Sequence, residues 1–214
     1  MHMLSPRQIH LDFHTSELIP EVGAAFDAEK FAQTMADAHV SSVTVFARGH
    51  HGWMYYDSKK FPERVHPTLT NKNLVVDQVR ALHARGIRAP LYVTVQWDYY
   101  TARNYPEWLA RNLDGSLVGN SFAEAGFYQT LCVNTGYRDF LKAHVKELID
   151  LFGDELDGFF FDIVGVRPCT CSVCRKMMTA RGLDFSDEQD LLVFTKDSLD
   201  DFQKDMSAFI RNYR

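Results

Sequence analysis

The chain has 214 residues, of which 46% are hydrophobic and 24% are charged, as is ordinary for one folded domain with a sizeable core. Its formal net charge of -5 is spread without long runs of like charge, which argues against the concentrated basic surface of a nucleic-acid-binding protein. No stretch is long and apolar enough to span a membrane, and the first residues lack the apolar core of a signal peptide. We therefore expect a cytoplasmic protein that binds neither nucleic acid nor membrane.

The apolar pattern predicts strands that alternate with helices. The strands are short apolar or alternating runs, and the helices carry apolar side chains three and four residues apart. In chain order, the predicted strands are Gln8–His14, Ser42–Ala47, Ala89–Val95 and Leu156–Val164. The first predicted helix follows Asp27, and the next two begin at Leu74 and at Tyr137. A final helical region is predicted from Leu191 to Tyr213. The segment from Phe127 to Val133 is expected to be irregular or a short hairpin.

This alternation predicts an α/β fold in which right-handed crossovers connect parallel strands. Loops rich in polar and aromatic residues follow the strands, at the edge where barrel enzymes carry their active sites. A whole (β/α) barrel takes about 250 residues, and only about four β/α units are evident. We therefore expect residues 1–214 to form a single (β/α) domain, an incomplete TIM-like barrel that is the N-terminal part of a larger catalytic barrel.

The sharpest motif is a cluster of three cysteines with the spacing C-x-C-x-x-C, at Cys169, Cys171 and Cys174. Three thiolates at this spacing can reach one ion, and tetrahedral zinc requires a fourth soft ligand. Cys132 is the only other cysteine in the chain. The pattern predicts a structural zinc site, because a zinc ion with four cysteine ligands has no open coordination position. Buried free thiols are the alternative interpretation.

A single carboxylate, Asp162, lies near the end of the fourth predicted strand, which reads as buried on both faces. It could cap the following loop or take part in chemistry. Loops after the other strands are expected to bring polar and aromatic groups to the same rim. These candidates for substrate binding are His14, His50, His51, Trp97 and Asp98. The adjacent histidines suit hydrogen bonding to a polar substrate better than chelation of one ion, and Asp12 is expected to balance charge beside His10 or His14.

Glycoside hydrolysis requires two carboxyl groups that flank the glycosidic bond, and Asp162 could be one of them. Five motifs bear on this possibility, namely His10–His14, His51–Tyr56, Leu82–Ile87, Tyr92–Asp98 and Asp157–Asp162. Together they resemble the N-terminal catalytic region of a hypothetical glycoside hydrolase family related to the α-L-fucosidases. The resemblance covers nearly the whole chain up to Cys174.

This resemblance implies a retaining mechanism with Asp162 as nucleophile and with His50 and His51 holding sugar hydroxyls. It also implies that His14 and Trp97 form further walls of the pocket. Members of the family continue through four more strand-helix units, which carry the general acid/base. Separately, the segment Leu131–Thr135 and the cysteine cluster are similar to the zinc site of certain barrel β-galactosidases, which supports Cys132 as the fourth ligand.

The favoured hypothesis is thus an α-L-fucosidase-like glycoside hydrolase that cleaves a terminal sugar. The alternative is a non-catalytic, zinc-stabilised carbohydrate-binding or assembly fragment that lacks the general acid/base. A zinc-dependent hydrolase is a third interpretation, and it requires an open metal position. The expected partner is a carbohydrate substrate, and an exposed half-barrel edge favours self-association or completion by the missing half-barrel.

Overall fold

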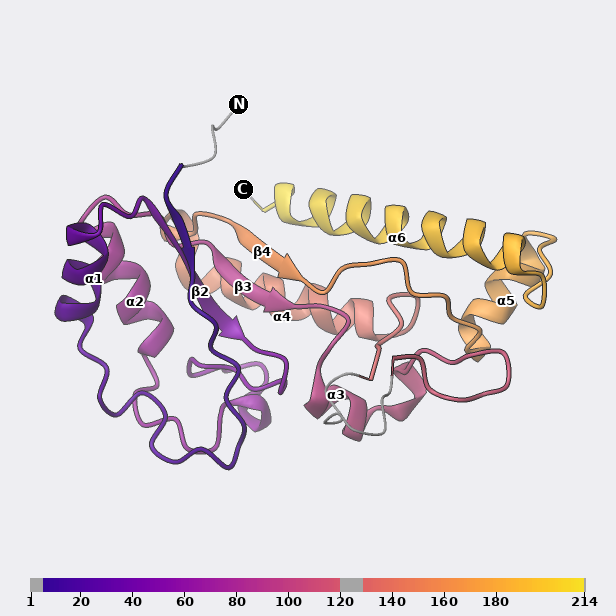
Figure 1. Cartoon of the computed structure of the whole chain (residues 1–214), viewed down its shortest axis with the longest axis horizontal. Coiled ribbons are helices and arrows are strands. Elements are labelled where there is room, and N and C mark those ends of the chain that lie inside the picture. The colour runs from indigo at the N-terminus through magenta and orange to yellow at the C-terminus, as the bar shows by residue number, and fades with distance from the viewer. Residues whose placement is uncertain (1–5, 120–128, 214) are drawn as a thin grey trace. The chain divides into compact units, whose positions relative to one another are not determined.

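The computed structural model describes residues 6–119 and 129–213 (Figure 1). The chain divides into two compact units, the first formed by Met1–Thr94 and Ile149–Asp162, the second by Val95–Leu148 and Ile163–Arg214. Among the described residues, no helix combines the length and the apolar character that a membrane crossing requires.

The first unit contains a four-stranded parallel sheet (Figure 1). Its strands are β1 (Gln8–His10), β2 (Ser42–Arg48), β3 (Leu91–Thr94) and β4 (Phe159–Asp162). Their order in the sheet, β1-β2-β3-β4, equals their order in the chain, as it does for consecutive strands of a (β/α) barrel. The predicted α/β class and the predicted incomplete barrel are therefore confirmed.

Two helices of the first unit lie side by side, and the second of them packs against β2 (Figure 1). Helix α1 (Ala28–Asp37) begins after Asp27, whose carboxylate accepts a hydrogen bond from the Lys30 backbone N–H at 2.9 Å. Helix α2 (Leu74–His83) is followed by Gly86, which has a φ of 68°. Both helices occur where the apolar spacing predicts them. The unit also contains the short 3-10 helices η1 (Pro62–Arg64) and η4 (Gly153–Glu155).

The prediction that the fourth strand is buried on both faces is wrong. Strands β2 and β3 are almost wholly buried, whereas the Phe160 side chain in β4 is 44% exposed. Within the described sheet, β4 is an edge strand that pairs only with β3. The first strand is also shorter than predicted, since β1 ends at His10 and the polar residues after it belong to a loop.

The second unit is mainly helical. Its helices are α3 (Tyr99–Asn104), η2 (Pro106–Trp108), α4 (Tyr137–Phe152), α5 (Ser172–Ala180) and α6 (Glu188–Arg211), and the last turn of α4 belongs to the first unit. Helices α4 and α6 match predicted helices, whereas α3 and α5 are additional. The predicted irregular segment from Phe127 to Val133 lies partly outside the described residues. Its described part makes antiparallel bridges with Trp97 and Leu109.

One carboxylate, Asp157, connects three parts of the first unit just before β4. Its Oδ2 accepts a hydrogen bond from the Ala89 backbone N–H at 2.6 Å and lies 2.7 Å from Nε2 of His83 in α2. Arg88 Nε is 3.5 Å from the other carboxylate oxygen. Burial opposes ionisation of Asp157, but these partners together hold its pKa below the ordinary value of 3.8. The ionised carboxylate therefore stabilises the junction of α2, β3 and β4.

Replacement of Asp157 by alanine should lower the free energy of unfolding by about 2 kcal/mol at neutral pH, because two charge-assisted hydrogen bonds are lost. A group with a lowered pKa in the folded state contributes stability above its unfolded pKa and loses it as the pH falls through the folded value. The difference between wild type and Asp157→Ala should therefore shrink below pH 3.8. Urea unfolding at several pH values measures this, with the exposed Asp154→Ala as the matched control. An equal effect of both substitutions would contradict the assignment.

Candidate functional site

The register of the sheet places a set of side chains on one face. Tyr92 is opposite Phe160, and Thr94 is opposite Asp162, so these four side chains share a face because side chains two residues apart on a strand point the same way. The ring of Phe46 from β2 stacks on Tyr92 with 3.9 Å between centroids, and Tyr92 stacks on Phe160 at 5.9 Å. An aromatic layer therefore lies beside Asp162 along this face.

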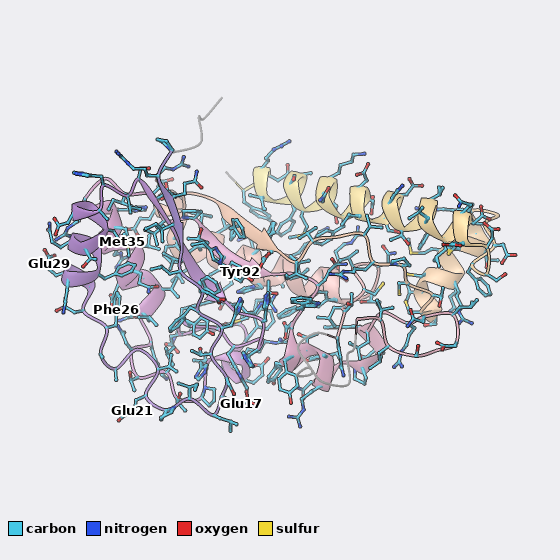
Figure 2. The ribbon with its side chains drawn as sticks, in the orientation of Figure 1. Glu17, Glu21, Phe26, Glu29, Met35 and Tyr92 are labelled. Atoms are coloured by element: carbon cyan, nitrogen blue, oxygen red, sulfur yellow. The ribbon has the colours of Figure 1, made fainter. Side chains whose placement is uncertain are left out.

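Asp162 is the last residue of β4, where the sequence predicts a carboxylate at the end of the strand. The Tyr92 hydroxyl donates a hydrogen bond to Asp162 Oδ2 at 2.6 Å, and Figure 2 labels Tyr92 on β3. Burial, together with the neighbouring carboxylate, raises the pKa of Tyr92, so the phenol keeps its proton and acts as the donor. The Asp162 side chain is 33% exposed, which leaves it accessible to a ligand.

The rings of His14 and His50 stack on each other, with 3.7 Å between centroids and 11° between planes. The His50 backbone N–H donates to His14 Nδ1 at 2.9 Å, so the proton of neutral His14 is on Nε2, which lies 3.3 Å from Asp12 Oδ1. Asp12 thus lies beside His14, as we expect from the sequence, but it faces a neutral ring and does not balance a charge. Gly49 permits the close approach, because a Cβ there would lie 2.9 Å from His14 Nδ1.

His50 connects β3 with the Asp162 carboxylate. Its Nδ1 lies 2.8 Å from the Thr94 hydroxyl, and its Nε2 lies 3.9 Å from Asp162 Oδ2. A carboxylate disfavours a facing lone pair, so we assign the proton to Nε2 and the donor role at Nδ1 to Thr94. Burial, reinforced by the neighbouring His14, lowers the pKa of His50 to about 3. His50 is therefore a neutral hydrogen-bond donor.

A buried cation supports this arrangement. Arg48 ends β2, is wholly buried, and donates from Nη2 to the Thr94 backbone carbonyl at 2.7 Å. Its positive charge disfavours protonation of the neighbouring His50 and thereby contributes to the low pKa of that imidazole. Arg48 lies one residue beyond the predicted strand Ser42–Ala47, and no role was predicted for it.

His51 lies in the loop after β2, half-buried beside a carboxylate from the loop after β1. That carboxylate is Glu17, labelled in Figure 2, and its Oε2 accepts a hydrogen bond from Trp53 Nε1 at 3.2 Å. Burial lowers the pKa of His51, and the Glu17 charge partly offsets this effect. Polar groups from both loops therefore gather around His51.

The other two predicted substrate-binding residues belong to the second unit. Asp98 is wholly buried, and its carboxylate accepts a hydrogen bond from the Thr101 backbone N–H at 2.8 Å, which caps the N-terminus of α3. Trp97 is partly buried and bridges to Thr130. Their contact with a substrate stays a prediction.

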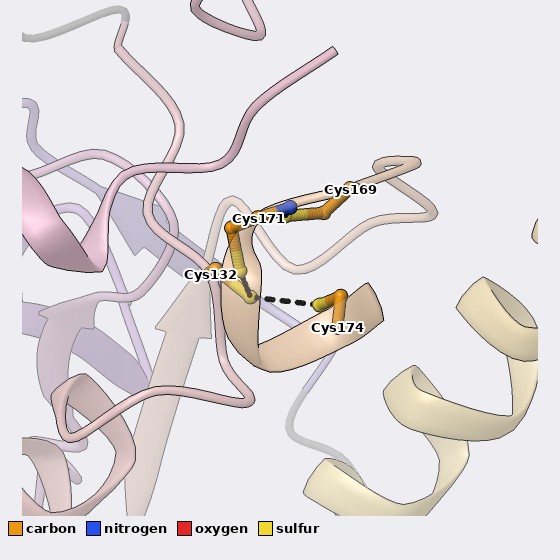
Figure 3. Close-up of side chains that lie close together, drawn as sticks. All are labelled: Cys132, Cys169, Cys171 and Cys174. Atoms are coloured by element: carbon orange, nitrogen blue, oxygen red, sulfur yellow. Dashed lines mark hydrogen bonds between the residues drawn. The ribbon is translucent and has the colours of Figure 1, made fainter. Parts of the chain in front are cut away.

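The second unit brings all four cysteines together (Figure 3). The sulfur atoms of Cys132, Cys169, Cys171 and Cys174 all lie within 4.8 Å of one another, and all four residues are buried. Cys132 Sγ is 3.4 Å from Cys174 Sγ and 3.9 Å from Cys171 Sγ. Four sulfur atoms at these distances could hold one metal ion, and the sequence-based grouping of Cys132 with the other three is confirmed.

Local structure explains how the cysteines meet. Cys171 is the N-cap of α5 and Cys174 lies in its first turn, where the partial positive charge of a helix N-terminus favours thiolates. Cys132 is brought to them by a hydrogen bond from its backbone N–H to the Trp108 carbonyl at 2.8 Å. Hydrogen bonding from Cys132 lowers the pKa of Cys171. The pKa of Cys169 is also lowered, whereas those of Cys132 and Cys174 are raised, so the thiolate form that binds metal is favoured at two of the four sulfurs.

Comparison with known proteins identifies the family. The sequence model of the family described as "Hypothetical glycosyl hydrolase 6" matches residues 27–163, more than half of the chain. The chain belongs to this family. No curated protein matches the chain.

Solved structures agree with this assignment. α-L-Fucosidase isoenzyme 2 from Paenibacillus thiaminolyticus is 35% identical to the chain, with a TM-score of 0.85 over 98% of this chain and 30% of that protein. A hypothetical protein from Ruminiclostridium thermocellum shares the fold, with a TM-score of 0.52 and 14% identity over 74% of this chain and 76% of that one. The chain thus spans less than a third of the length of the fucosidase.

Four residues of this site were not predicted from the sequence, namely Arg48, Tyr92, Thr94 and Glu17. A signal exists for Tyr92 and Thr94, because they alternate with Leu91, Val93 and Val95 in a predicted strand. Alternation of this kind indicates that the two polar side chains share one face near the end of the strand. For Glu17 the loop sequence offers no comparable signal.

The imidazole of His50 should stay neutral well below pH 6.5 and titrate only near pH 3, because its burial penalises the charged form. Since the unfolded chain binds this proton first, His50 should reduce stability progressively as the pH falls from 6.5 towards 3. Long-range ¹H–¹⁵N spectra measure both the titration and the proton position, which we expect on Nε2. The exposed His39 serves as the reference. A His50 midpoint near 6.5 would rule out the neutral-donor role.

Proposed function

We propose that this chain is the N-terminal part of the catalytic barrel of a retaining, α-L-fucosidase-like glycoside hydrolase, with Asp162 as the nucleophile. One observation carries the assignment. Asp162 ends β4, accepts a hydrogen bond from Tyr92 and faces Nε2 of His50. Family membership and the 35% identity to a fucosidase support the substrate class.

In the proposed first step, an Asp162 oxygen attacks the anomeric carbon of a terminal sugar as the bond to the leaving oxygen breaks. A general acid gives that oxygen a proton, and a glycosyl ester remains on Asp162. In the second step, the same group removes a proton from water as the water oxygen attacks the anomeric carbon, which releases Asp162 and the sugar. We propose that a later strand of the complete barrel supplies this second carboxyl group.

The neighbours of Asp162 fit this role. The Tyr92 hydroxyl donates to Oδ2, which orients the carboxylate. The transition state resembles an oxocarbenium ion and carries positive charge. Burial keeps the pKa of His14 and His50 below the ordinary histidine value, so neutral rings can hydrogen-bond to sugar hydroxyls without repelling that charge.

We further propose that His50 and His51 hold sugar hydroxyls and that His14 lines their pocket, whereas substrate binding by Trp97 and Asp98 of the second unit stays a prediction from the sequence. Asp98 would act through its position at the start of α3, since its carboxylate already caps that helix. The neutral rings of His14 and His50 also suit a second candidate function, in which the chain is a non-catalytic, zinc-stabilised carbohydrate-binding or assembly fragment. In that case these residues bind a carbohydrate without turnover until the remaining half-barrel completes the site.

Substitution of Asp162 by asparagine should lower hydrolysis of an aryl α-L-fucoside by about 10³-fold or more, because a carboxamide is a poor nucleophile. The rate is measured on this chain and on a longer chain that includes the remaining barrel. The exposed helical residue Asp37→Asn is the matched control and should leave the rate unchanged. Equal rates for wild type and Asp162→Asn would exclude the nucleophile assignment, and L-fucose binding without turnover in both chains would favour the second candidate.

We also propose that the cysteine cluster binds zinc in a structural role. Four sulfur donors in tetrahedral reach of one ion suit zinc or iron–sulfur chemistry, and a closed set of four thiolates leaves no position for substrate. The ion would tie the segment of Cys132 to the N-terminus of α5. It would supply cross-linking rather than chemistry at Asp162.

Purified protein should contain about one zinc per chain, and Co²⁺ in its place should produce the near-ultraviolet absorption of thiolate-to-metal charge transfer. A chelator should lower the melting temperature, because metal binding to the folded chain alone contributes to its stability. Cys132→Ser should weaken binding, whereas Ser172→Ala, beside the cluster in sequence, should not. Iron with visible cluster absorption, or no bound metal, would overturn the zinc proposal.

A further inference from the structure

The Asn134 side chain contacts both the cysteine cluster and α6. Its Nδ2 lies 3.4 Å from Cys174 Sγ and 3.0 Å from the hydroxyl oxygen of Ser198. Ser198 is buried in α6, on the same stripe as Phe194 and Phe202. One amide group therefore hydrogen-bonds to a candidate metal ligand and to the C-terminal helix.

Arg138 fixes the orientation of this amide. Its Nη2 donates to Asn134 Oδ1 at 3.4 Å, and a guanidinium has no acceptor. The oxygen end of the amide must therefore face Arg138, and the nitrogen end must face Cys174 and Ser198. An N–H directed at sulfur stabilises a thiolate more than a thiol, because the hydrogen bond is charge-assisted.

Arg138 also binds α6 directly. Arg138 Nη1 lies 2.7 Å from Asp201 and 3.4 Å from Asp205, and its guanidinium lies 5.7 Å from the centroid of the Phe202 ring. Lys142, one turn further along α4, pairs with Asp205 at 2.7 Å. A continuous set of hydrogen bonds and ion pairs thus runs from the cysteine cluster to the middle of α6.

Apolar side chains also connect the cysteine cluster with α6. Phe194 of α6 and Met178 of α5 belong to one buried cluster with all four cysteines. Any ion held by the cysteines would therefore lie against the inner stripe of α6, with Asn134 as the polar connection between them. The hydrogen bond from Asn134 to Ser198 then does more than satisfy a half-buried amide and a buried hydroxyl.

We propose that Asn134 and Ser198 form a link through which the metal centre holds α6 in place, so that metal binding and docking of α6 stabilise each other. This inference rests on the proposed metal site. Thermodynamic linkage requires the coupling to be reciprocal, so whatever loosens α6 weakens metal binding by the same factor. Asn134 and Ser198 are positioning residues here, since the cysteines supply the ligands.

The test compares zinc affinity, by competition with a chromophoric chelator, in wild type and four variants. Asn134→Ala should bind zinc about 10-fold more weakly. Asn134→Asp keeps the partner of Arg138 but directs a carboxylate at the thiolates, so its loss should be larger. Ser198→Ala should show a smaller loss in the same direction. Asn104→Ala, an exposed asparagine at the end of α3, is the matched control and should bind like wild type.

A second measurement follows hydrogen exchange in α6. Hydrogen exchange in α6 of wild type should slow when zinc is added, most of all around Ser198, and Asn134→Ala should lose this protection. If wild type binds zinc and both Asn134→Ala and Asn134→Asp bind it as tightly as wild type does, the proposed link is wrong while the proposed metal site stands. If zinc binds without changing exchange in α6, the coupling is wrong. If wild type binds no metal, the metal proposal itself fails, and this inference fails with it.

Discussion

The parallel pairing of β3 with β4 sets Thr94 opposite Asp162 and puts Tyr92 on the same face of the sheet. From this register it follows that the Tyr92 hydroxyl reaches the carboxylate and that the Thr94 hydroxyl reaches His50. A slip of one residue would turn Tyr92 and Thr94 to the opposite face and remove both contacts at once. Strands β2 and β3 are buried on both faces, so the same slip would also force side chains of different size into closely packed positions. The chemistry proposed for this unit therefore depends on ordinary strand packing.

The groups around Asp162 keep two histidine side chains neutral. The wholly buried Arg48 lies close enough to His50 to disfavour its protonation, and the stacked ring of His14 has the same effect. Both imidazoles are thus kept neutral and oriented by hydrogen bonds at Nδ1, with Nε2 directed at a carboxylate in each case. In a site meant to stabilise developing positive charge, neutral donors with fixed tautomers suit the task better than charged ones. The electrostatics agree with the glycosidase family to which the chain belongs.

The second unit depends on a different constraint. Its helices are held around a small buried core that contains all four cysteines, and the described hydrogen bonds spread from there through Asn134 to α6. The coordinate bonds of a metal ion would stabilise this unit where it buries little apolar surface, as they commonly do in short segments without a large core. In barrel enzymes the loops after the strands carry the active site. These loops lie on the surface, so interactions outside the barrel core must hold them in place. The cysteine cluster after β4 fits that need.

The sequence by itself determined the α/β alternation, the cap of α1 at Asp27, the starts of α2 and α4, the position of Asp162 at a strand end and the cysteine grouping. Each of these is encoded within a few neighbouring residues, as a period, a cap or a spacing. Only the tertiary structure decided that Tyr92 donates to Asp162 and that Asn134 joins Cys174 to α6. The first pair is 70 positions apart in sequence and the second is 40, and contacts at such separations depend on strand register and helix packing. The exposure of β4 likewise depends on which strands are present to cover it, a property that no local pattern records.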